Sequence, residues 1–378
     1  MEFCNIKFKK KEIFFWFAYI LLIIYRVIKS TTIGFNDKGF MYIIIIGFFI
    51  INIVYQRVTI NRMMSYGLLF ILISLYVFKT KEPIIPIFIL AIMSVKEIEF
   101  KKIVKVSFCL VLPIVVITVL LAMLGVIPDI VTYRNFGNKS VPCHGMGFNH
   151  SSALPTYFTF IFMEYFYLKK KEIKIIDLII FVLGGYIIFL NCAERLRFYI
   201  IFIIVFLLLF KKSISKILFK IKENKSFLIF PIIAIISWTI GYIYNPKNSI
   251  FYLLNILLSN RLYFQNYAFN NLNISLFGHR IPMGEDAILI NGNLSYFYLD
   301  SAYTYILFSY GVLFTFYILW IYSKGFKEAH SEKDYILWLW YFMLAIDSCV
   351  GNQFMSIWII PIALYPFCKK NKKYITNI

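Results

Sequence analysis

Charged and imidazole side chains gather in three polar stretches that separate long apolar runs. The first stretch, TYRNFGNKSVPCHGMGFNHSSALPTYF, places Asn149 and His150 directly before an apolar run. The second, NCAERLRFYIIF, places Glu194, Arg195 and Arg197 between two apolar runs. A guanidinium offers a planar fork of donors that suits a phosphate or a carboxylate, and a histidine can accept a proton near neutral pH. These residue types therefore indicate binding of an anionic group combined with general-base chemistry.

The third stretch, residues 244–299, is the longest segment outside the apolar runs. Its apolar residues from Leu262 to Leu272 recur near helical spacing, which predicts a surface helix lying along a membrane. The candidate site residues in this stretch and directly after it are Arg261, His279, Arg280 and Asp300. This set is expected on the same side of the membrane as Arg195.

Structural roles explain part of these patterns equally well. Ser151 or Ser152 can cap the helix that follows, with His150 as a polar neighbour, although the positive end of that helix could also hold an anion. Arg195 can pair with Glu194 or with a lipid phosphate, or it can grip a diphosphate in bidentate fashion. Both interpretations stay open for each residue.

No metal site and no cofactor are predicted. The histidines His144, His150 and His279 match no metal-ligand spacing, and the six cysteines occur singly, without a C-x-x-C pair. The short loops carry no G-x-x-x-x-G-K-[ST] phosphate cradle, so a nucleotide-driven domain is not expected. Any group transfer must therefore use a substrate that is already activated.

The composition indicates a membrane protein that positions these polar stretches between helices. Hydrophobic residues make up 61% of the 378 residues and charged residues only 15%, which favours a polytopic membrane protein over a soluble domain. The net charge of +20 comes from short Lys and Arg clusters between apolar blocks, so nucleic acid is not an expected partner.

Apolar runs of roughly 15 to 25 residues predict about twelve membrane-spanning helices. The runs centre on 12–28, 40–55, 63–78, 83–95, 105–127, 152–168, 174–191, 196–210, 226–243, 300–322, 334–349 and 354–367. The predicted fold class is therefore an all-α polytopic integral membrane protein. Residues 1–378 are expected to form a single membrane domain.

The distribution of basic residues predicts the orientation of these helices. With the N-terminus inside, the cytoplasmic segments hold more than twice as many Lys and Arg residues as the outer segments. Both termini are therefore predicted to be cytoplasmic. A loop at 128–151 and the large loop at 244–299, between the ninth and tenth spans, are predicted to face outward.

Four stretches of the chain resemble, in order and spacing, the Wzy-type polysaccharide polymerases of the O-antigen ligase and polymerase superfamily. The stretches are GMGFNHSSALPTYF, NCAERLRFYIIF, SNRLYFQNYAFNNLNISLFGHR and LDSAYTYILFSYGVL. They resemble the family's Gly-Phe-x-His before a span, its Arg opening the eighth span, its Arg and Leu-Phe-Gly in the large outer loop, and its Asp-x-x-Tyr followed by Tyr-Gly. The chain departs from the family in having His-Ser-Ser at 150–152 and Glu-Arg-Leu at 194–196.

The resemblance implies a helical membrane glycosyltransferase with a GT-C-like fold, without metal or cofactor, in the plasma membrane of a bacterium. Its substrate would be undecaprenyl-diphosphate-linked oligosaccharide, and its other partners would be the lipid bilayer and polysaccharide-export and chain-length proteins. The implied product is capsular polysaccharide or exopolysaccharide. The implied catalytic residues are His150 and Asp300, and the implied substrate-binding or diphosphate-binding residues are Arg195, Arg197, Arg261, His279, Arg280, Asn149 and Tyr303.

The expected chemistry agrees with these residue types. An acceptor hydroxyl attacks a sugar anomeric carbon while a diphosphate leaves, so arginines would neutralise the leaving group and His150 or Asp300 would take the proton. A ligase of the same superfamily and a flippase for lipid-linked oligosaccharide remain as alternatives. A transporter is expected to place charges deep in the bilayer, whereas these charges are predicted at the outer surface, which favours an enzyme.

Overall fold

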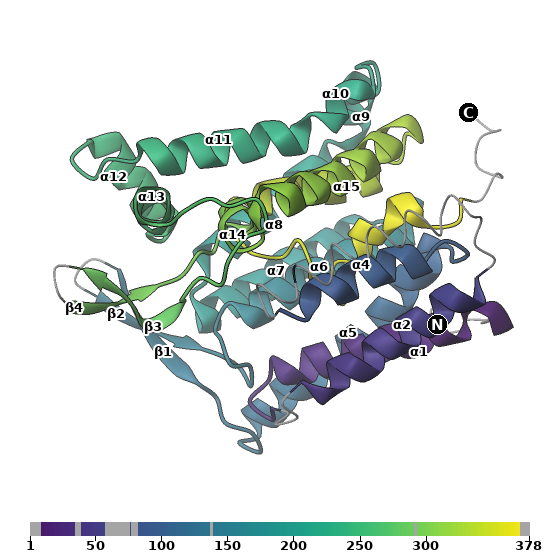
Figure 1. Ribbon diagram of the computed structural model, residues 1–378, viewed down its shortest axis with the longest axis horizontal. Coiled ribbons are helices and arrows are strands. Elements are labelled where there is room, and N and C mark those ends of the chain that lie inside the picture. The colour runs from purple at the N-terminus through teal and green to yellow at the C-terminus, as the bar shows by residue number, and fades with distance from the viewer. Residues whose placement is uncertain are drawn as a thin grey trace.

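The computed structural model describes residues 9–34, 39–56, 76, 82–136, 139–290 and 293–370. Most of the described chain is helical, as predicted, and the long helices run side by side along one axis, with two β-hairpins at one end (Figure 1). The predicted span at 63–78 lies outside the described residues apart from Tyr76.

Helices occupy most of the predicted spans. In the first half of the chain they are α1 (Ile13–Lys29), α2 (Phe40–Tyr55), α4 (Ile84–Ser94), α5 (Phe100–Met123), α6 (Ala153–Lys169), α7 (Ile175–Cys192) and α8 (Arg195–Leu209). In the second half they are α9 (Lys211–Leu218), α10 (Asn224–Phe227), α11 (Ile229–Ile243), α12 (Ser249–Leu257), α13 (Arg261–Asn271), α14 (Ala302–Ser309), α15 (Gly311–Ser331) and α16 (Tyr335–Asp347). Three short 3₁₀ helices are η1 (Lys10–Glu12), η2 (Lys170–Glu172) and η3 (Pro361–Phe367).

Fewer helices reach membrane-spanning length than the sequence predicts. Among the described residues, α5, α7 and the continuous stretch Asn224–Ile243 are long and apolar enough to cross a bilayer. The pair α8 and α9, bent by 79°, makes a fourth if it is counted as one span. Helices such as α4, with 11 residues, are much shorter, because a bilayer core of about 30 Å requires about 20 residues at 1.5 Å each.

The outer face of α7 is apolar, which is typical of a helix that contacts lipid. Its exposed side chains recur at helical spacing and are all large and hydrophobic: Ile175, Ile176, Ile179, Ile180, Leu183, Tyr186, Ile187 and Leu190. A helix on the surface of a soluble protein carries polar side chains on that face.

The predicted span 300–322 is not one helix. It consists of α14 and α15, which are separated at Tyr310 because Gly311 has a left-handed φ of +79°. The backbone of the loop at Ser275 and Leu276 packs against this break, where Val312 N donates to the Ser275 carbonyl over 3.0 Å. The prediction of a single tenth span is therefore wrong.

The predicted span 354–367 is also not an α-helix. Residues 354–366 are buried, yet they form irregular backbone followed by η3, in which Pro361 and Pro366 have no N–H to donate. Hydroxyl groups from the surrounding helices satisfy the carbonyls of this segment. Tyr19 donates to Ile357 over 3.0 Å, Tyr341 donates to Ile362 over 2.8 Å, and Tyr322 donates to Phe354.

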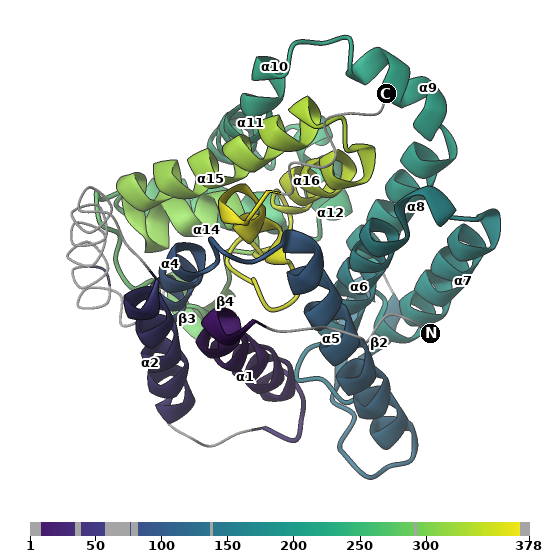
Figure 2. The same ribbon diagram turned by 90° about the vertical axis from the view of Figure 1, so that its right-hand side faces the viewer.

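Figure 2 shows this yellow segment inside the molecule, with α4, α5 and α15 around it. It occupies the place of a membrane-length helix in the bundle without being an α-helix. Within the hydrocarbon region of a membrane, non-helical backbone is tolerated only where it is surrounded by protein or lines a water-filled cavity.

Two antiparallel β-hairpins, which the sequence analysis did not predict, lie in the two loops predicted to face outward. Strands β1 (Val131–Phe136) and β2 (Lys139–His144) form the first, and β3 (Gly284–Ile290) and β4 (Asn293–Phe297) form the second. Both hairpins lie with α12 and α13 at one end of the bundle, and α9 and α10 lie at the other end (Figure 1).

Candidate functional site

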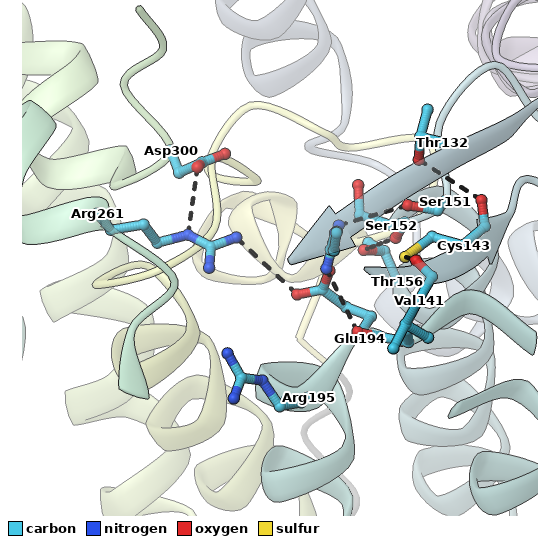
Figure 3. Close-up of polar contacts among 12 residues, drawn as sticks. Thr132, Val141, Cys143, Ser151, Ser152, Thr156, Glu194, Arg195, Arg261 and Asp300 are labelled. Atoms are coloured by element: carbon cyan, nitrogen blue, oxygen red, sulfur yellow. Dashed lines mark hydrogen bonds and ion pairs between the residues drawn. The ribbon is translucent and has the colours of Figure 1, made fainter. Parts of the chain in front are cut away.

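Four charged side chains from four separate segments alternate in sign at the hairpin end of the bundle, and we call them the ionic cluster. Arg134 Nη1 lies 2.6 Å from Glu194 Oε2, and Arg261 Nη2 lies 3.9 Å from Glu194 Oε1. Arg261 Nε then lies 3.3 Å from Asp300 Oδ2. Figure 3 shows the row that leads from Asp300 through Arg261 to Glu194.

Glu194 occupies the turn between α7 and α8. Ala193 ends α7 with a left-handed φ of 51°, which turns the chain back on itself and directs Glu194 into the protein, where only 4% of its side chain is exposed. Arg134 on β1 approaches the same turn and also contacts the Ala193 carbonyl and the Ser151 hydroxyl, each over 3.4 Å. The first hairpin is thereby tied to the start of α6 and to the α7–α8 turn.

Arg261 is oriented by the corner between α12 and α13. Its Nη1 donates to the Leu258 carbonyl over 3.3 Å, and only 13% of its side chain is exposed. Asn255 braces the corner, because its side chain donates to the Asn260 side chain over 3.0 Å and accepts from Tyr263 N over 3.1 Å. The predicted surface helix thus exists as α13, and it begins at Arg261.

Asp300 lies just before α14, and its environment changes its acidity. Its side chain is 36% exposed, but burial by the surrounding protein raises the pKa of its carboxyl group, while Arg261 opposes the rise. Glu194 raises the same pKa, and Arg134 and His150 lower it. A raised pKa moves a carboxylate toward the range where a general base is effective.

Arg195 and His150 lie beside the ionic cluster. Arg195 Nη2 donates to the Ile256 carbonyl at the end of α12 over 3.4 Å, and Figure 3 shows its guanidinium pointing toward the space between Arg261 and Glu194. His150 is exposed in the turn before α6 and is close enough to Asp300 to affect its pKa.

The turn that carries His150 is fixed to the end of α1. Asn149 donates from its backbone N to the Ser30 carbonyl over 3.0 Å and from its side chain to the Lys29 carbonyl over 3.2 Å. Ser152 occupies the N-cap position of α6, but its side chain makes no capping hydrogen bond, and Ser151 instead contacts Arg134. The helix start is therefore not capped by a serine side chain as the sequence suggested.

Arg197 and Tyr303 are buried in the bundle interior, and Arg197 lines the same small cavity as Glu194 of the ionic cluster. Arg197 forms a buried ion pair with Asp347 at the end of α16. Tyr303 is fully buried and donates its hydroxyl to the Ala345 carbonyl over 3.0 Å. These two predicted binding residues pair with groups on or near α16 and not with members of the ionic cluster.

His279 and Arg280 line a separate cavity of about 490 Å³ at the base of the second hairpin. Glu82, Tyr305 and Tyr310 also line it, and the two tyrosine hydroxyls lie 3.2 Å apart. The sequence analysis expected Arg280 only on the same side of the membrane as Arg195, and in the structure Arg280 lines this cavity while Arg261 belongs to the ionic cluster.

The sequence analysis missed Arg134 as a member of the site. The signal that could have found it is the Gly-Asn pair between VTYRNF and KSVPC, which is typical of a β-hairpin turn. A hairpin there would have placed Arg134 on a strand next to the other loops.

Metal chemistry has no evident ligands in the described segments. No group of three or more His, Cys, Asp or Glu side chains is close enough together there to hold an ion. The acidic members of the ionic cluster each face an arginine instead.

Comparison of the chain with protein-family models, with curated proteins and with solved structures finds no match. The arrangement of side chains therefore carries the functional argument.

Proposed function

We propose that this protein is a membrane glycosyltransferase that joins undecaprenyl-diphosphate-linked oligosaccharide repeat units into capsular polysaccharide or exopolysaccharide. The observation that carries the proposal is the ionic cluster, in which Arg261 contacts Asp300 beside Arg195 and His150. Several arginines next to a carboxylate of raised pKa are what transfer from a diphosphate donor requires.

In the proposed reaction, the hydroxyl oxygen of the acceptor sugar attacks the anomeric carbon of the donor. The bond between that carbon and the diphosphate oxygen breaks, and its electron pair leaves with the diphosphate. Arg261 and Arg195 offset the charge that develops there. Asp300 or His150 takes the proton of the attacking hydroxyl, a contribution of roughly 10²- to 10⁴-fold in rate.

The proposal includes a membrane arrangement. The protein would be a multi-pass protein of the bacterial plasma membrane with about twelve spans, a GT-C-like fold and both termini in the cytoplasm. Support comes from the two loops 128–151 and 244–299, which gather at the same end of the bundle, while the Lys-rich helix α9 lies at the other end. The ionic cluster would then face the outer surface, where lipid-linked repeat units are joined.

The decisive experiment deletes the gene in a host that makes capsule or exopolysaccharide. The length of the lipid-linked glycans is then measured separately for the inner and outer faces of the membrane. Single repeat units at the outer face, restored to long polymer by the wild-type gene, are expected. Long polymer left on lipid would identify a ligase instead, and single units trapped inside would identify a flippase. Export and chain-length proteins must be intact in the host, because they are the expected partners of the reaction.

A further inference from the structure

Glu194 lies between two arginines at the place where the proposed function needs an anion. Its two carboxylate oxygens divide between the partners, with Oε2 at 2.6 Å from Arg134 and Oε1 at 3.9 Å from Arg261. The carboxylate is almost completely enclosed, since only 4% of the Glu194 side chain is exposed. A buried carboxylate in this position screens two guanidinium groups that would otherwise repel each other.

Glu194 forms an ion pair with Arg261 but does not accept a hydrogen bond from its guanidinium. The 3.9 Å contact is an ion pair that is too long for a hydrogen bond, and Arg261 Nε lies 3.3 Å from Asp300 Oδ2 without forming an aligned hydrogen bond. A buried guanidinium donor without an acceptor is costly. Nη1 of Arg261 donates to the Leu258 carbonyl, whereas Nη2 and Nε are available to a second, larger anion that reaches them better than the carboxylates of Glu194 and Asp300 do.

A diphosphate offers such an anion. It carries more negative charge and more acceptor oxygens than a carboxylate, and it binds the same planar fork of donors. The diphosphate and the Glu194 carboxylate cannot contact the same donors of Arg261 at the same time. Glu194 belongs to the non-helical turn between α7 and α8, so its side chain can rotate without unwinding either helix.

We infer that Glu194 is a resident anion that occupies the diphosphate position when no substrate is bound, and that the substrate diphosphate displaces it from Arg261. This inference rests on the proposed function and concerns the same site. Glu194 is a positioning residue, which keeps Arg134 and Arg261 aligned in the empty site and lowers the affinity of the site for anions. Only a ligand with enough negative charge displaces Glu194 from Arg261, so the site selects a diphosphate over a monophosphate.

The test measures binding of farnesyl diphosphate to the full-length protein in detergent by calorimetry. Glu194→Gln is expected to bind it roughly tenfold more tightly than the wild type, because a charged competitor for the arginine donors is removed. The matched control is Glu285→Gln, which removes one exposed negative charge from the large loop that carries Arg261 and is expected to leave the affinity unchanged. Farnesyl monophosphate is expected to gain more from Glu194→Gln than farnesyl diphosphate does.

The outcomes separate this inference from the proposed function. Equal or weaker binding of farnesyl diphosphate by Glu194→Gln, with binding still lost in Arg261→Ala, overturns the inference and leaves the diphosphate site in place. Absence of binding in every form, wild type included, overturns both. If Glu194→Gln does not fold, Glu194→Asp carries the test, since its shorter side chain keeps the charge but withdraws from Arg261. Glu194→Asp is then expected to bind more tightly than the wild type, and an unchanged affinity contradicts the inference.

Discussion

Gly278 and Gly311 meet backbone to backbone, although 33 positions separate them in the sequence. A Cβ atom on Gly311 would lie 2.3 Å from Gly278 N, and a Cβ atom on Gly278 would lie 2.2 Å from the Ser309 carbonyl oxygen. Both glycines also have left-handed φ values, +73° and +79°. The contact seats the loop that carries His279 against the break between α14 and α15.

Alanine at either glycine is therefore expected to destabilise the protein. The left-handed backbone costs roughly 1–2 kcal/mol for a residue with a Cβ atom, and the backbone clash adds to it, so we expect a loss of about 2 kcal/mol or more. Thermal unfolding in detergent measures the effect. Gly47→Ala on α2 is the control, because nothing lies within 4 Å of its Cβ position, and it should unfold at the wild-type temperature or above. Equal unfolding temperatures for all three variants would show that the contact is not important.

Arg261 is expected to need its guanidinium geometry as well as its charge. Arg261→Lys keeps the charge but loses the fork that contacts Glu194 and Asp300, so polymer formation should fall by roughly 100-fold, as for other lost transition-state donors. The assay uses purified protein and lipid-linked repeat units. Lys247→Ala, which removes an exposed charge from the same outer loop, should retain full activity. Full activity of Arg261→Lys would remove Arg261 from the diphosphate site.

The pH dependence of polymer formation should follow the ionisation of Asp300. A general base acts in its deprotonated form, so activity should rise as the pH increases through the pKa of Asp300, which burial raises above its usual range. Glu194 contributes to that rise, so Glu194→Gln should lower the pKa of Asp300 and move the acidic limb of the profile to lower pH. If Asp300→Asn polymerises within a few-fold of the wild type and His150→Gln does not, His150 is the base instead.

The ion pair of Arg197 and Asp347 should be structural. It joins the start of α8 to the end of α16, and removal of one partner leaves a buried charge, which typically costs 3–5 kcal/mol. Arg197→Met and Asp347→Leu should each lower the yield of folded protein, and the double variant should recover it. A double variant that folds like the wild type but makes no polymer would instead assign Arg197 to substrate binding.

Labelling from outside the cell tests the predicted orientation. Cysteines are introduced at Lys216 on α9 and at Asn270 on α13, two exposed positions at opposite ends of the bundle, in a background without native cysteines. An impermeant thiol reagent should label Asn270→Cys in intact cells and Lys216→Cys only after lysis. The reverse pattern would place the ionic cluster in the cytoplasm and exclude joining of repeat units at the outer face.

Local patterns in the sequence predict the helices well, because each apolar run carries its own signal. The run at 174–191 became α7, and the helical spacing after Arg261 became α13. The departures come from interactions between distant segments. The break at Gly311 depends on the loop at Ser275, and the irregular segment before η3 depends on hydroxyls such as that of Tyr19.

The site was predictable in its residue types and only partly in its grouping. Asp300 and Arg195 could be selected because each lies at the edge of an apolar run, and Arg261 because it lies in the large polar loop at the start of the predicted surface helix. The acidic partner of each arginine could not be predicted in the same way. Arg195 and Arg197 are two positions apart at the start of the same apolar run, so the sequence pattern does not distinguish them. The structure buries one against Asp347 and leaves the other beside Arg261, a difference set by the direction in which α8 presents each side chain.

The buried segment 354–366 has a consequence for biosynthesis. Its enclosing helices, α1, α4, α5 and α15, all leave the ribosome before it does, so they must begin to pack while the centre of their bundle is still missing. The hydroxyls of Tyr19 and Tyr322 have no carbonyl acceptor from this segment until it is synthesised. A nonsense codon at Gln353 would therefore remove the central segment of the bundle and not a dispensable tail. Cellular quality control should degrade the truncated protein even though all of the α-helices had been synthesised.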